Sequence, residues 1–367
     1  MKPRLVIDLN RVAVNAGRFR HLVTAAFPGR LVRSFYAVKA NSSPEILDLL
    51  HGMGMGGWVI SAKDLAAVRA RSLPIVAGGF VRSEAFLDAA VRDAEYVVIE
   101  NAQEVARIEA AGSALGRRPR VLLSVRNGPT AKLGCTLEDI RRIARSEKLD
   151  IAGAHFHAHR RTATTESLPG MMGQLSEAMS ILEASGRECR ILNFGGGLVE
   201  PSVEPDELAW RLAHYREVVP AGVKEIHFEP GRYLVGDTGT LTCQIEYVDA
   251  AQRVLFLGIG VLAYKMTQAT PSVFLDDDRG ENTIGLWRLH GFWPSEYDSL
   301  DAVALKGIPR PGDILHLKNL GAYSAGVESR FDPEDSARPA FLYGTASSFS
   351  NPSSAEKGAQ PVGPPLT

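Results

Sequence analysis

Cysteine is scarce in this sequence, and the spacings that bind metals are missing from it. Its three cysteines, Cys135, Cys189 and Cys243, lie far apart and form no CxxC or Cys/His pattern. An odd number of widely separated cysteines suits neither a disulfide framework nor a zinc site. We therefore expect buried free thiols and no bound metal.

Net charge and long apolar runs are lacking as well. The chain has 41 basic and 42 acidic residues, which gives no reason to expect a nucleic-acid partner or an anionic membrane surface. No uninterrupted apolar run reaches the length of about 18 residues that a membrane span needs, and Asp8 comes before any apolar signal region develops. These absences predict a soluble cytoplasmic protein.

What the sequence does contain is a long series of apolar, β-branched segments separated by helix-like stretches. With 367 residues and 45% hydrophobic content, the chain is large enough for two domains. Eight strand candidates within about 200 residues predict a (β/α)8 TIM-type barrel. They are 33–38, 57–60, 73–77, 95–99, 120–125, 151–156, 190–194 and 225–228.

The first of these strands ends at Lys39. Ser43 and Pro44 follow as an N-cap and a first helical residue, and Ile46, Leu49 and Leu50 would share one face of that helix. Spacings typical of capped helix starts recur at 61–64 and 136–139. A partly desolvated lysine at the carboxyl end of a barrel strand can form a Schiff base with a carbonyl cofactor, but a single such lysine is more often a surface charge.

Other chemically useful residues follow the remaining strands, so all of them would meet at one mouth of the barrel. Each has a simpler explanation alone, because glycines form turns, Asn101 can cap a helix and His157 can be a core residue. Their occurrence together predicts a functional site. The residues are Ser61, Gly78-Gly79, Asn101, Arg126, His157, Gly195-Gly196-Gly197 and Glu229.

After Arg232 the pattern changes to strands with turns between them, at 240–248, 253–258 and 313–317. We predict a barrel domain over 10–235 and an all-β domain over 236–344, with the N-terminal strand 1–9 added to the latter. Residues 345–367 are rich in Ser, Pro, Gly and Ala, which predicts a disordered tail.

Six motifs in order resemble the fold-type III pyridoxal-phosphate enzymes, the family of diaminopimelate, ornithine and arginine decarboxylases, with the alanine racemases as relatives. The resemblance runs from about Leu5 to Asp332. The motifs are Tyr36-Ala37-Val38-Lys39-Ala40-Asn41, Lys132-Leu133-Gly134, His155-Phe156-His157, Gly195-Gly196-Gly197, Glu229-Pro230-Gly231-Arg232 and Gly321-Ala322-Tyr323.

The resemblance implies a role for each matching residue. Lys39 would hold pyridoxal phosphate, and His157 would lie flat against its ring. Backbone N–H groups of the glycine triplet would approach the phosphate, helped by the positive end of a following helix. Further contacts with the cofactor would come from Arg126, Arg232 and Tyr323.

Glu229 indicates the reaction class. The resemblance implies that the Glu229 carboxylate faces the pyridine nitrogen of the cofactor and keeps that nitrogen protonated, because the ion pair favours both charged forms. The cofactor is then a strong electron sink, which suits loss of CO2. The alanine racemases have an arginine at this position, so Glu229 favours decarboxylation.

The substrate side departs from the family pattern. The family's loop carries a proton-donating cysteine that reaches the neighbouring subunit; here the matching loop, 291–298, has Pro294 at that position and keeps Asp298. Glu296, Tyr297, His157 and Lys39 remain as possible proton donors. Ala158-His159-Arg160-Arg161 replaces a usual x-Gly-Ser, and Trp58 replaces a usual aspartate. Arg160 and Arg161 are either partners of an anionic group or solvated loop arginines.

The sequence therefore predicts a homodimeric pyridoxal-phosphate-dependent decarboxylase with shared active sites, which releases CO2 and an amine from an amino acid or its conjugate. The alternatives are an amino-acid racemase or epimerase and a non-catalytic pyridoxal-phosphate-binding paralogue. The predicted catalytic residues are Lys39, His157, Glu229 and Asp298. The predicted substrate contacts are Arg160, Glu296 and Asp298.

Overall fold

The computed structural model describes residues 1–79, 82–128, 131–159, 163–262, 264, 272–276, 283–324 and 340–344. The chain divides into two compact units, one formed by residues 15–234 and the other by residues 1–14 together with 235–367. The predicted disordered tail, 345–367, lies outside the described residues.

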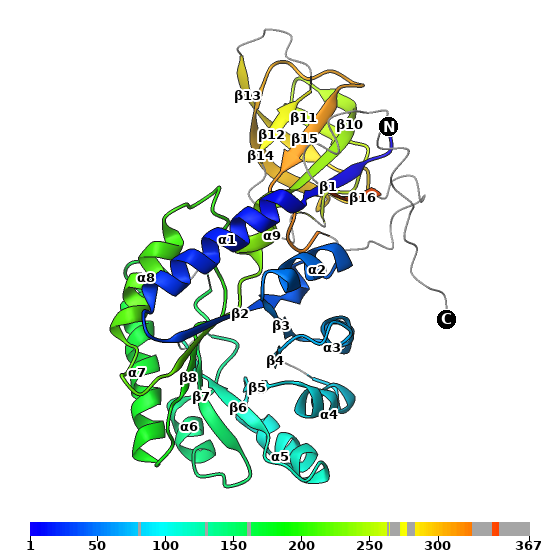
Figure 1. Ribbon diagram of the computed structural model, residues 1–367. Coiled ribbons are helices and arrows are strands. Elements are labelled where there is room, and N and C mark those ends of the chain that lie inside the picture. Colours follow the sequence, from blue (N-terminus) through cyan, green and yellow to red (C-terminus); the bar gives the residue numbers. More distant parts are fainter. Residues whose placement is uncertain are drawn as a thin grey trace. The chain divides into compact units, whose positions relative to one another are not determined.

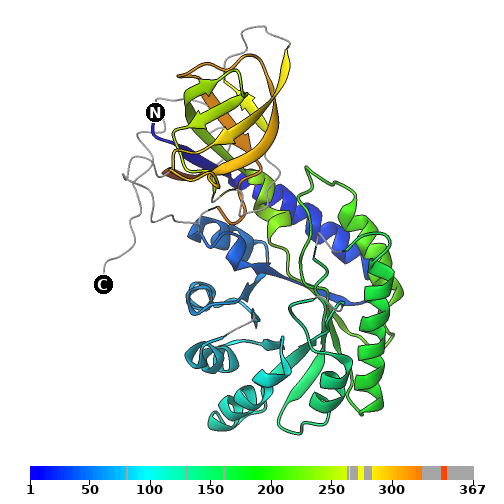
Figure 2. The ribbon, with the colours of Figure 1, turned by 180° about the vertical axis from the view of Figure 1, so that it is seen from behind.

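Residues 15–234 form a closed barrel of eight strands that pair in parallel in chain order, with helices outside the ring (Figures 1 and 2). The predicted (β/α)8 barrel is confirmed, and each predicted strand agrees with the structure to within two residues at either end. The strands are β2 (Leu31–Ala37), β3 (Gly56–Val59), β4 (Ile75–Ala77), β5 (Tyr96–Ile99), β6 (Arg120–Ser124), β7 (Asp150–His155), β8 (Ile191–Asn193) and β9 (Glu225–Phe228). The helices are α1 (Leu9–Ala26), which starts before this unit, α2 (Pro44–Gly52), α3 (Ala62–Arg69), α4 (Glu84–Asp93), α5 (Val105–Ala114), α6 (Leu137–Ile143), α7 (Leu168–Ala184), α8 (Glu207–Glu217) and α9 (Arg232–Val235).

Side chains from the strands fill the barrel, as expected for a parallel sheet closed on itself. One cluster contains Phe35, Trp58, Val98 and Ile191, all buried. The barrel is thus a packed core, and chemistry is confined to the loops that follow its strands.

Local sequence signals set most helix starts. Thr136 and Asp139 form the predicted reciprocal capping box at the start of α6. Ser61 Oγ accepts a hydrogen bond from the Asp64 N–H, but the reciprocal bond from the Ser61 N–H to the Asp64 carboxylate is not formed. Ser43 precedes α2 as predicted, but its side chain makes no capping hydrogen bond. The Asn41 side chain instead accepts a hydrogen bond from the Ser43 N–H at 3.1 Å.

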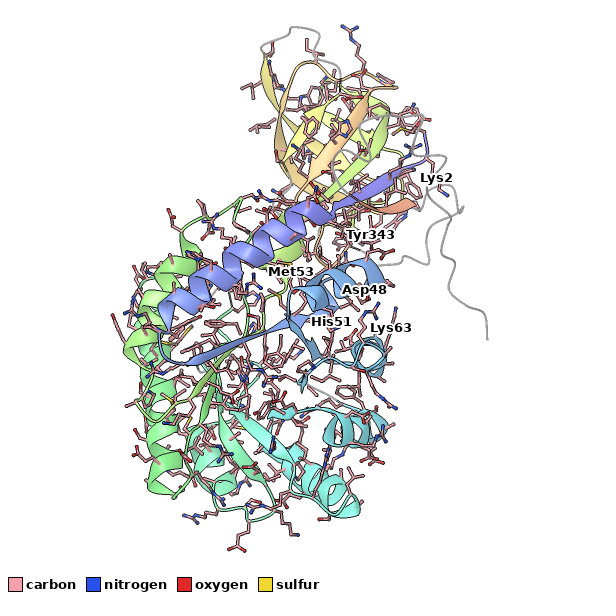
Figure 3. All side chains as sticks on the ribbon, in the orientation of Figure 1. Lys2, Asp48, His51, Met53, Lys63 and Tyr343 are labelled. Carbon is pink, nitrogen blue, oxygen red and sulfur yellow. The ribbon has the colours of Figure 1, made fainter. Side chains whose placement is uncertain are left out.

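The outer face of α2 is polar. Asp48 and His51, labelled in Figure 3, are exposed. The buried face carries Ile46, Leu47 and Leu50, so Leu47 takes the place that the sequence pattern gave to Leu49. Leu47 and Leu49 are two positions apart, about 200° around the helix, so they flank the Ile46–Leu50 line on opposite sides and the buried face is rotated from the predicted one.

The second unit is built from strands, and β1 joins it as predicted. Its sheet has the order β12-β15-β10-β11-β13-β14, with β1 paired to β10 and β16. The sequence pattern found β1, β10, β11 and β15 but missed the rest, because β12 has only three residues and β13 alternates irregularly between exposed and buried positions. The strands are β1 (Arg4–Asp8), β10 (Gly239–Asp249), β11 (Val254–Leu257), β12 (Val273–Leu275), β13 (Ile284–His290), β14 (Ser299–Lys306), β15 (Ile314–Lys318) and β16 (Ala340–Gly344).

The three cysteines are free thiols. Cys135 and Cys243 are buried as predicted, whereas Cys189 is only half-buried. Burial raises the pKa of Cys135 to about 12, which leaves it protonated and unreactive at neutral pH. Among the described residues, we find no helix with the length and apolarity that crossing a membrane requires.

Alanine substitutions at two glycines of the barrel unit should change the free energy of unfolding in opposite directions. A Cβ at Gly153, on β7, would collide with the Ile191 carbonyl oxygen on β8. Gly153→Ala should therefore destabilise the protein by about 1–3 kcal/mol, the cost of overpacking. Gly173, exposed on α7, has nothing within 4 Å of that position. Gly173→Ala should stabilise by about 0.5–1 kcal/mol through helix propensity. Chemical denaturation of both variants checks this, and equal effects would contradict the packing argument.

Candidate active site

Lys39 lies in a short 3-10 turn, Val38–Ala40, directly after β2. Its side chain is exposed to solvent, although many protein atoms surround the amine. The resulting loss of hydration lowers the pKa of Lys39, although the charges of Glu229 and Glu100 act in the opposite direction. A larger fraction of Lys39 is thus the free amine at neutral pH than for a solvated lysine, which suits a nucleophile.

Trp58, from β3, lies against this amine. The Lys39 Nζ is 4.7 Å from the centre of the indole ring, and the indole is buried. Gly78 makes room for it, since a Cβ there would be 3.0 Å from the ring. Trp58 Nε1 is buried without a hydrogen-bond partner among the described residues. Lys39 therefore rests on an aromatic face, because Trp58 stands where the family usually has an aspartate.

His157 follows β7 and is held by the glycine triplet. Its Nδ1 accepts a hydrogen bond from the Gly196 N–H at 3.2 Å, so the ring proton lies on Nε2 when the ring is neutral. Burial and the positive charges of Lys39 and His155 lower the pKa of His157 well below its ordinary value. His157 is consequently a neutral ring at physiological pH, able to pack against a flat aromatic group.

Each glycine of the triplet is required by close backbone packing. A Cβ at Gly195 would be 2.8 Å from the Phe156 carbonyl oxygen. At Gly196 it would collide with the Glu229 carbonyl oxygen, and at Gly197 with that of Ala158. Gly195 and Gly197 also have positive φ angles of 60° and 74°. The triplet, called the cradle, is a turn of closely packed backbone in which Gly195 and Gly196 are buried and Gly197 is half-buried.

One part of the sequence-based expectation for this cradle is wrong. We expected a helix to follow the triplet and to direct its positive end at a phosphate. The next helix, α8, begins only at Glu207, and that residue accepts a hydrogen bond from the Val199 N–H at 2.8 Å. Within the cradle, the Gly195 N–H donates to Asn193 Oδ1 at 2.8 Å and the Gly196 N–H donates to His157, so a phosphate would be held by the Gly197 N–H and by nearby side chains.

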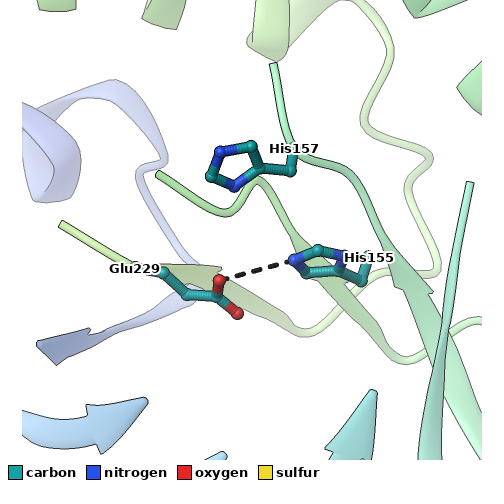
Figure 4. A group of neighbouring side chains, drawn as sticks. All are labelled: His155, His157 and Glu229. Carbon is teal, nitrogen blue, oxygen red and sulfur yellow. Dashed lines mark hydrogen bonds and ion pairs between the residues drawn. The ribbon is translucent and has the colours of Figure 1, made fainter. Parts of the chain in front are cut away.

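Glu229 is a buried carboxylate of the mouth and is hydrogen-bonded from two neighbouring strands. Asn193 Nδ2 donates to Oε1 at 2.7 Å, and His155 Nε2 contacts Oε2 at 3.4 Å. Figure 4 shows the His155 contact as a dashed line beside His157. Ligand atoms of His155, His157 and Glu229 lie within 4.8 Å of one another, a spacing that also suits a metal ion. His155, however, already uses both ring nitrogens, on Ser124 and Glu229.

Arg126 is fixed by the Lys132-Leu133-Gly134 motif. Arg126 Nε donates to the Gly134 carbonyl at 3.1 Å, and a Cβ at Gly134 would lie 2.6 Å from the Arg126 backbone nitrogen. The motif's glycine thus lets two segments touch and aims the guanidinium group.

Arg232 makes an ion pair that the sequence did not suggest. Its Nη1 is 2.9 Å from Glu200 Oε1, and both side chains are largely buried. Glu200 follows the glycine triplet in the chain, so it sets the position of Arg232 beside the cradle. Arg160 and Arg161, which were predicted to lie near the same loops, fall outside the described residues.

The predicted residues Glu296, Asp298 and Tyr323 belong to the other unit. Asp298 is fully buried, and its carboxylate accepts the backbone N–H groups of Val261, Leu262 and Trp293 at 2.6, 2.7 and 3.0 Å. This arrangement corrects our expectation that Asp298 presents its carboxylate to a substrate, because the carboxylate is used to shape its own loop. Pro294 and Glu296, on the same loop, are exposed.

A family model described as the pyridoxal-dependent decarboxylase, pyridoxal binding domain, matches residues 17–236. The chain belongs to the pyridoxal-dependent decarboxylase family. Its predicted family and its predicted cofactor, pyridoxal phosphate, are thereby confirmed, and with them the enzyme class of carboxy-lyases.

Similar proteins carry related names. The chain is 27% identical to the diaminopimelate decarboxylase of Aquifex aeolicus over 61% of its own length and 58% of that protein. It is 23% identical to the diaminopimelate decarboxylase of Campylobacter jejuni over 84% and 83% of the two chains. The fold matches the diaminopimelate decarboxylase of M. jannaschii in complex with L-lysine, with a TM-score of 0.80 at 18% identity over 94% of this chain and 87% of that one.

The residues of the mouth fit this cofactor. Lys39, whose pKa is lowered, suits the cofactor's aldehyde, and the neutral ring of His157 suits its aromatic ring. The glycine cradle suits the phosphate, and the buried Glu229 carboxylate suits the ring nitrogen. The sequence reasoning did not assign roles to His155, Ser124, Asn193 or Glu200. Among these residues, only His155 was marked in the sequence, because it belongs to the His155-Phe156-His157 motif. The others become visible only when strands distant in sequence are placed side by side.

Trp58 yields a test of the Lys39 environment. Trp58→Asp should raise the pKa of Lys39, because a carboxylate would stabilise the ammonium form. Trp58→Phe keeps an aromatic face and should leave the pKa near that of the wild type. The pH dependence of Lys39 modification by an amine-reactive reagent in cofactor-free protein, followed by mass spectrometry, measures both. Identical profiles for Trp58→Asp and the wild type would contradict the arrangement.

Proposed function

We propose that this chain decarboxylates an amino acid or amino-acid conjugate at the mouth of the barrel and releases CO2 and an amine. The observation that carries the proposal is the buried Glu229 carboxylate held beside Lys39 at the strand ends. Membership in the decarboxylase family supports it. An arginine in place of Glu229 would have favoured a racemase.

Pyridoxal phosphate, when bound, withdraws electrons from the amino-acid Cα and so makes departure of the α-carboxyl group possible. Lys39 supplies the amine that attaches the cofactor, and its lowered pKa keeps that amine reactive. Glu229 holds a proton on the ring nitrogen. His157 supports the ring face, and the cradle formed by residues 195–197 receives the phosphate.

Arg232 would assist at the phosphate, guided by Glu200. Its charge is already paired with a carboxylate, so it contributes as one member of a pair and not as a lone cation. Because the N–H groups of Gly195 and Gly196 already donate to Asn193 and His157, the cradle contributes the Gly197 N–H as its phosphate ligand in this proposal, next to the Arg232–Glu200 pair.

The substrate side of the site is proposed to come from a second copy of the chain. In this scheme the 291–298 loop of one subunit reaches the barrel mouth of its partner, and Asp298 keeps that loop in shape through its three backbone hydrogen bonds. Exposed Glu296 would meet the substrate, and Tyr323 would contact the cofactor. Pro294 has no proton to give, so protonation of the product falls to another residue. A cytoplasmic location remains a prediction from the sequence.

The reaction class is tested by comparing two variants. Glu229→Ala should reduce CO2 release much more than Pro294→Cys, because Glu229 acts on the bond-breaking step and position 294 only on later protonation, a step worth about two to four orders of magnitude in general acid catalysis. A panel of amino acids and conjugates is assayed for CO2 and for chiral inversion in parallel, with Lys39→Ala as the inactive reference. Inversion at Cα without CO2 would replace the decarboxylase proposal with a racemase.

The shared site is tested by subunit mixing. Lys39→Ala and Asp298→Ala chains are each expected to be inactive, but a mixed dimer would hold one intact site, so activity should return to at most about a quarter of the wild-type level. The matched control mixes Lys39→Ala chains with Glu229→Ala chains. Both substitutions lie on the barrel, so each of the two sites in a mixed dimer contains one defective barrel and no activity should return. Equal results for the two mixtures, with subunit exchange demonstrated, would refute shared sites.

A further inference from the structure

Glu229 is held at both carboxylate oxygens by side chains from the ends of β7 and β8. Asn193 donates to Oε1 at 2.7 Å, and His155 lies 3.4 Å from Oε2. All three side chains are at most 3% exposed. Hydrogen bonds at both oxygens fix the plane of a carboxylate and not only its location.

The orientation of the Asn193 amide is determined by its own contacts. Its Oδ1 accepts the Gly195 N–H at 2.8 Å, which requires Nδ2 to point to Glu229. Asn193 therefore connects the first residue of the glycine cradle to the carboxylate. The two ends of the proposed cofactor site are set by one side chain.

His155 is fixed in the same way from its other side. Its Nδ1 lies 3.0 Å from Ser124 Oγ, at the end of β6, and Nε2 must carry the proton that it shares with Glu229 because a carboxylate only accepts. Burial lowers the pKa of His155, but Glu229 and Glu100 raise it by more, so the pKa lies above its ordinary value. The neighbouring ring of His157 is 6.4 Å away, centre to centre.

We propose that His155 and Asn193 are positioning residues that clamp the Glu229 carboxylate so that it is aimed at the ring nitrogen before the cofactor arrives, with Ser124 holding His155 in place. This inference rests on the proposed function. The inference adds to the proposed function a set of residues that act on the cofactor only through Glu229. Preorganisation of this kind strengthens binding because no side chain has to be ordered when the cofactor enters.

The barrel contains a matched control for a merely structural histidine. His227, on β9, is as buried as His155 and is also bonded to a glutamate, with Nε2 3.0 Å from Glu225 Oε2. Its ring packs against Phe35 and Tyr96, whereas its relation to the clamp runs through the backbone, since His227 is the register partner of Asn193 and precedes Glu229 by two residues. Replacing the His227 side chain should destabilise the barrel while leaving the side-chain hydrogen bonds of the clamp in place.

The experiment measures pyridoxal-phosphate affinity and the absorption band of the bound cofactor in the full-length protein, together with thermal unfolding of each cofactor-free variant. His155→Leu should weaken affinity about ten-fold or more, the usual effect of losing a hydrogen bond to a charged group, and should shift the absorption band. His155→Gln retains an amide donor and should recover part of the affinity. Asn193→Asp, which places a second carboxylate against Glu229, should weaken affinity further, whereas His227→Leu should lower the unfolding temperature but leave affinity and band unchanged.

Ser124→Ala removes the support of His155 with little change in packing, so it tests the clamp if His155→Leu fails to fold. It should weaken affinity in the same direction as His155→Leu. Wild-type affinity and an unchanged band in whichever of these two variants folds would overturn the inference, and so would an equal loss of affinity in His227→Leu. Wild-type protein that binds no pyridoxal phosphate would instead refute the proposed function itself.

Discussion

Burial of one carboxylate at the carboxyl ends of the barrel strands is the constraint on which the site depends. A charged oxygen removed from water must receive hydrogen-bond donors, and Glu229 receives them from Asn193 and His155. Those donors lie at the ends of β8 and β7, so the carboxylate can be satisfied only when the parallel strands are in register. Completion of the site consequently depends on closure of the barrel.

The fold was predictable because its signals are local and repeated. Each strand is a short apolar run, and capping residues such as Thr136 with Asp139 mark helix starts within four positions of sequence. The β unit was less predictable, since β13 and β14 are exposed on much of their length and their pattern depends on which neighbours cover them. Propensity alone does not contain that information.

The residues of the candidate site also differ in whether local sequence reveals them. Lys39, His157 and the glycine triplet could be found because each follows a strand and has a chemical use in its own right. Asn193 and Ser124 could not, because an amide and a hydroxyl at strand ends acquire meaning only from partners 36 and 31 positions away. Asp298 misled for the same reason: its position in a loop motif suggested chemistry, while its three backbone hydrogen bonds give it a structural role.

The glycine triplet touches the carbonyl groups of Phe156, Ala158 and Glu229, which belong to the segments after β7 and β9. Three loops are therefore packed mainly backbone to backbone, with the His157 ring as the side chain that also contacts the triplet. An insertion or a bulkier residue in any one of them has to be matched in the other two at once. Divergence toward a new substrate is accordingly easier through the remaining loops of the barrel, and directed-evolution libraries for this scaffold should leave these three loops intact.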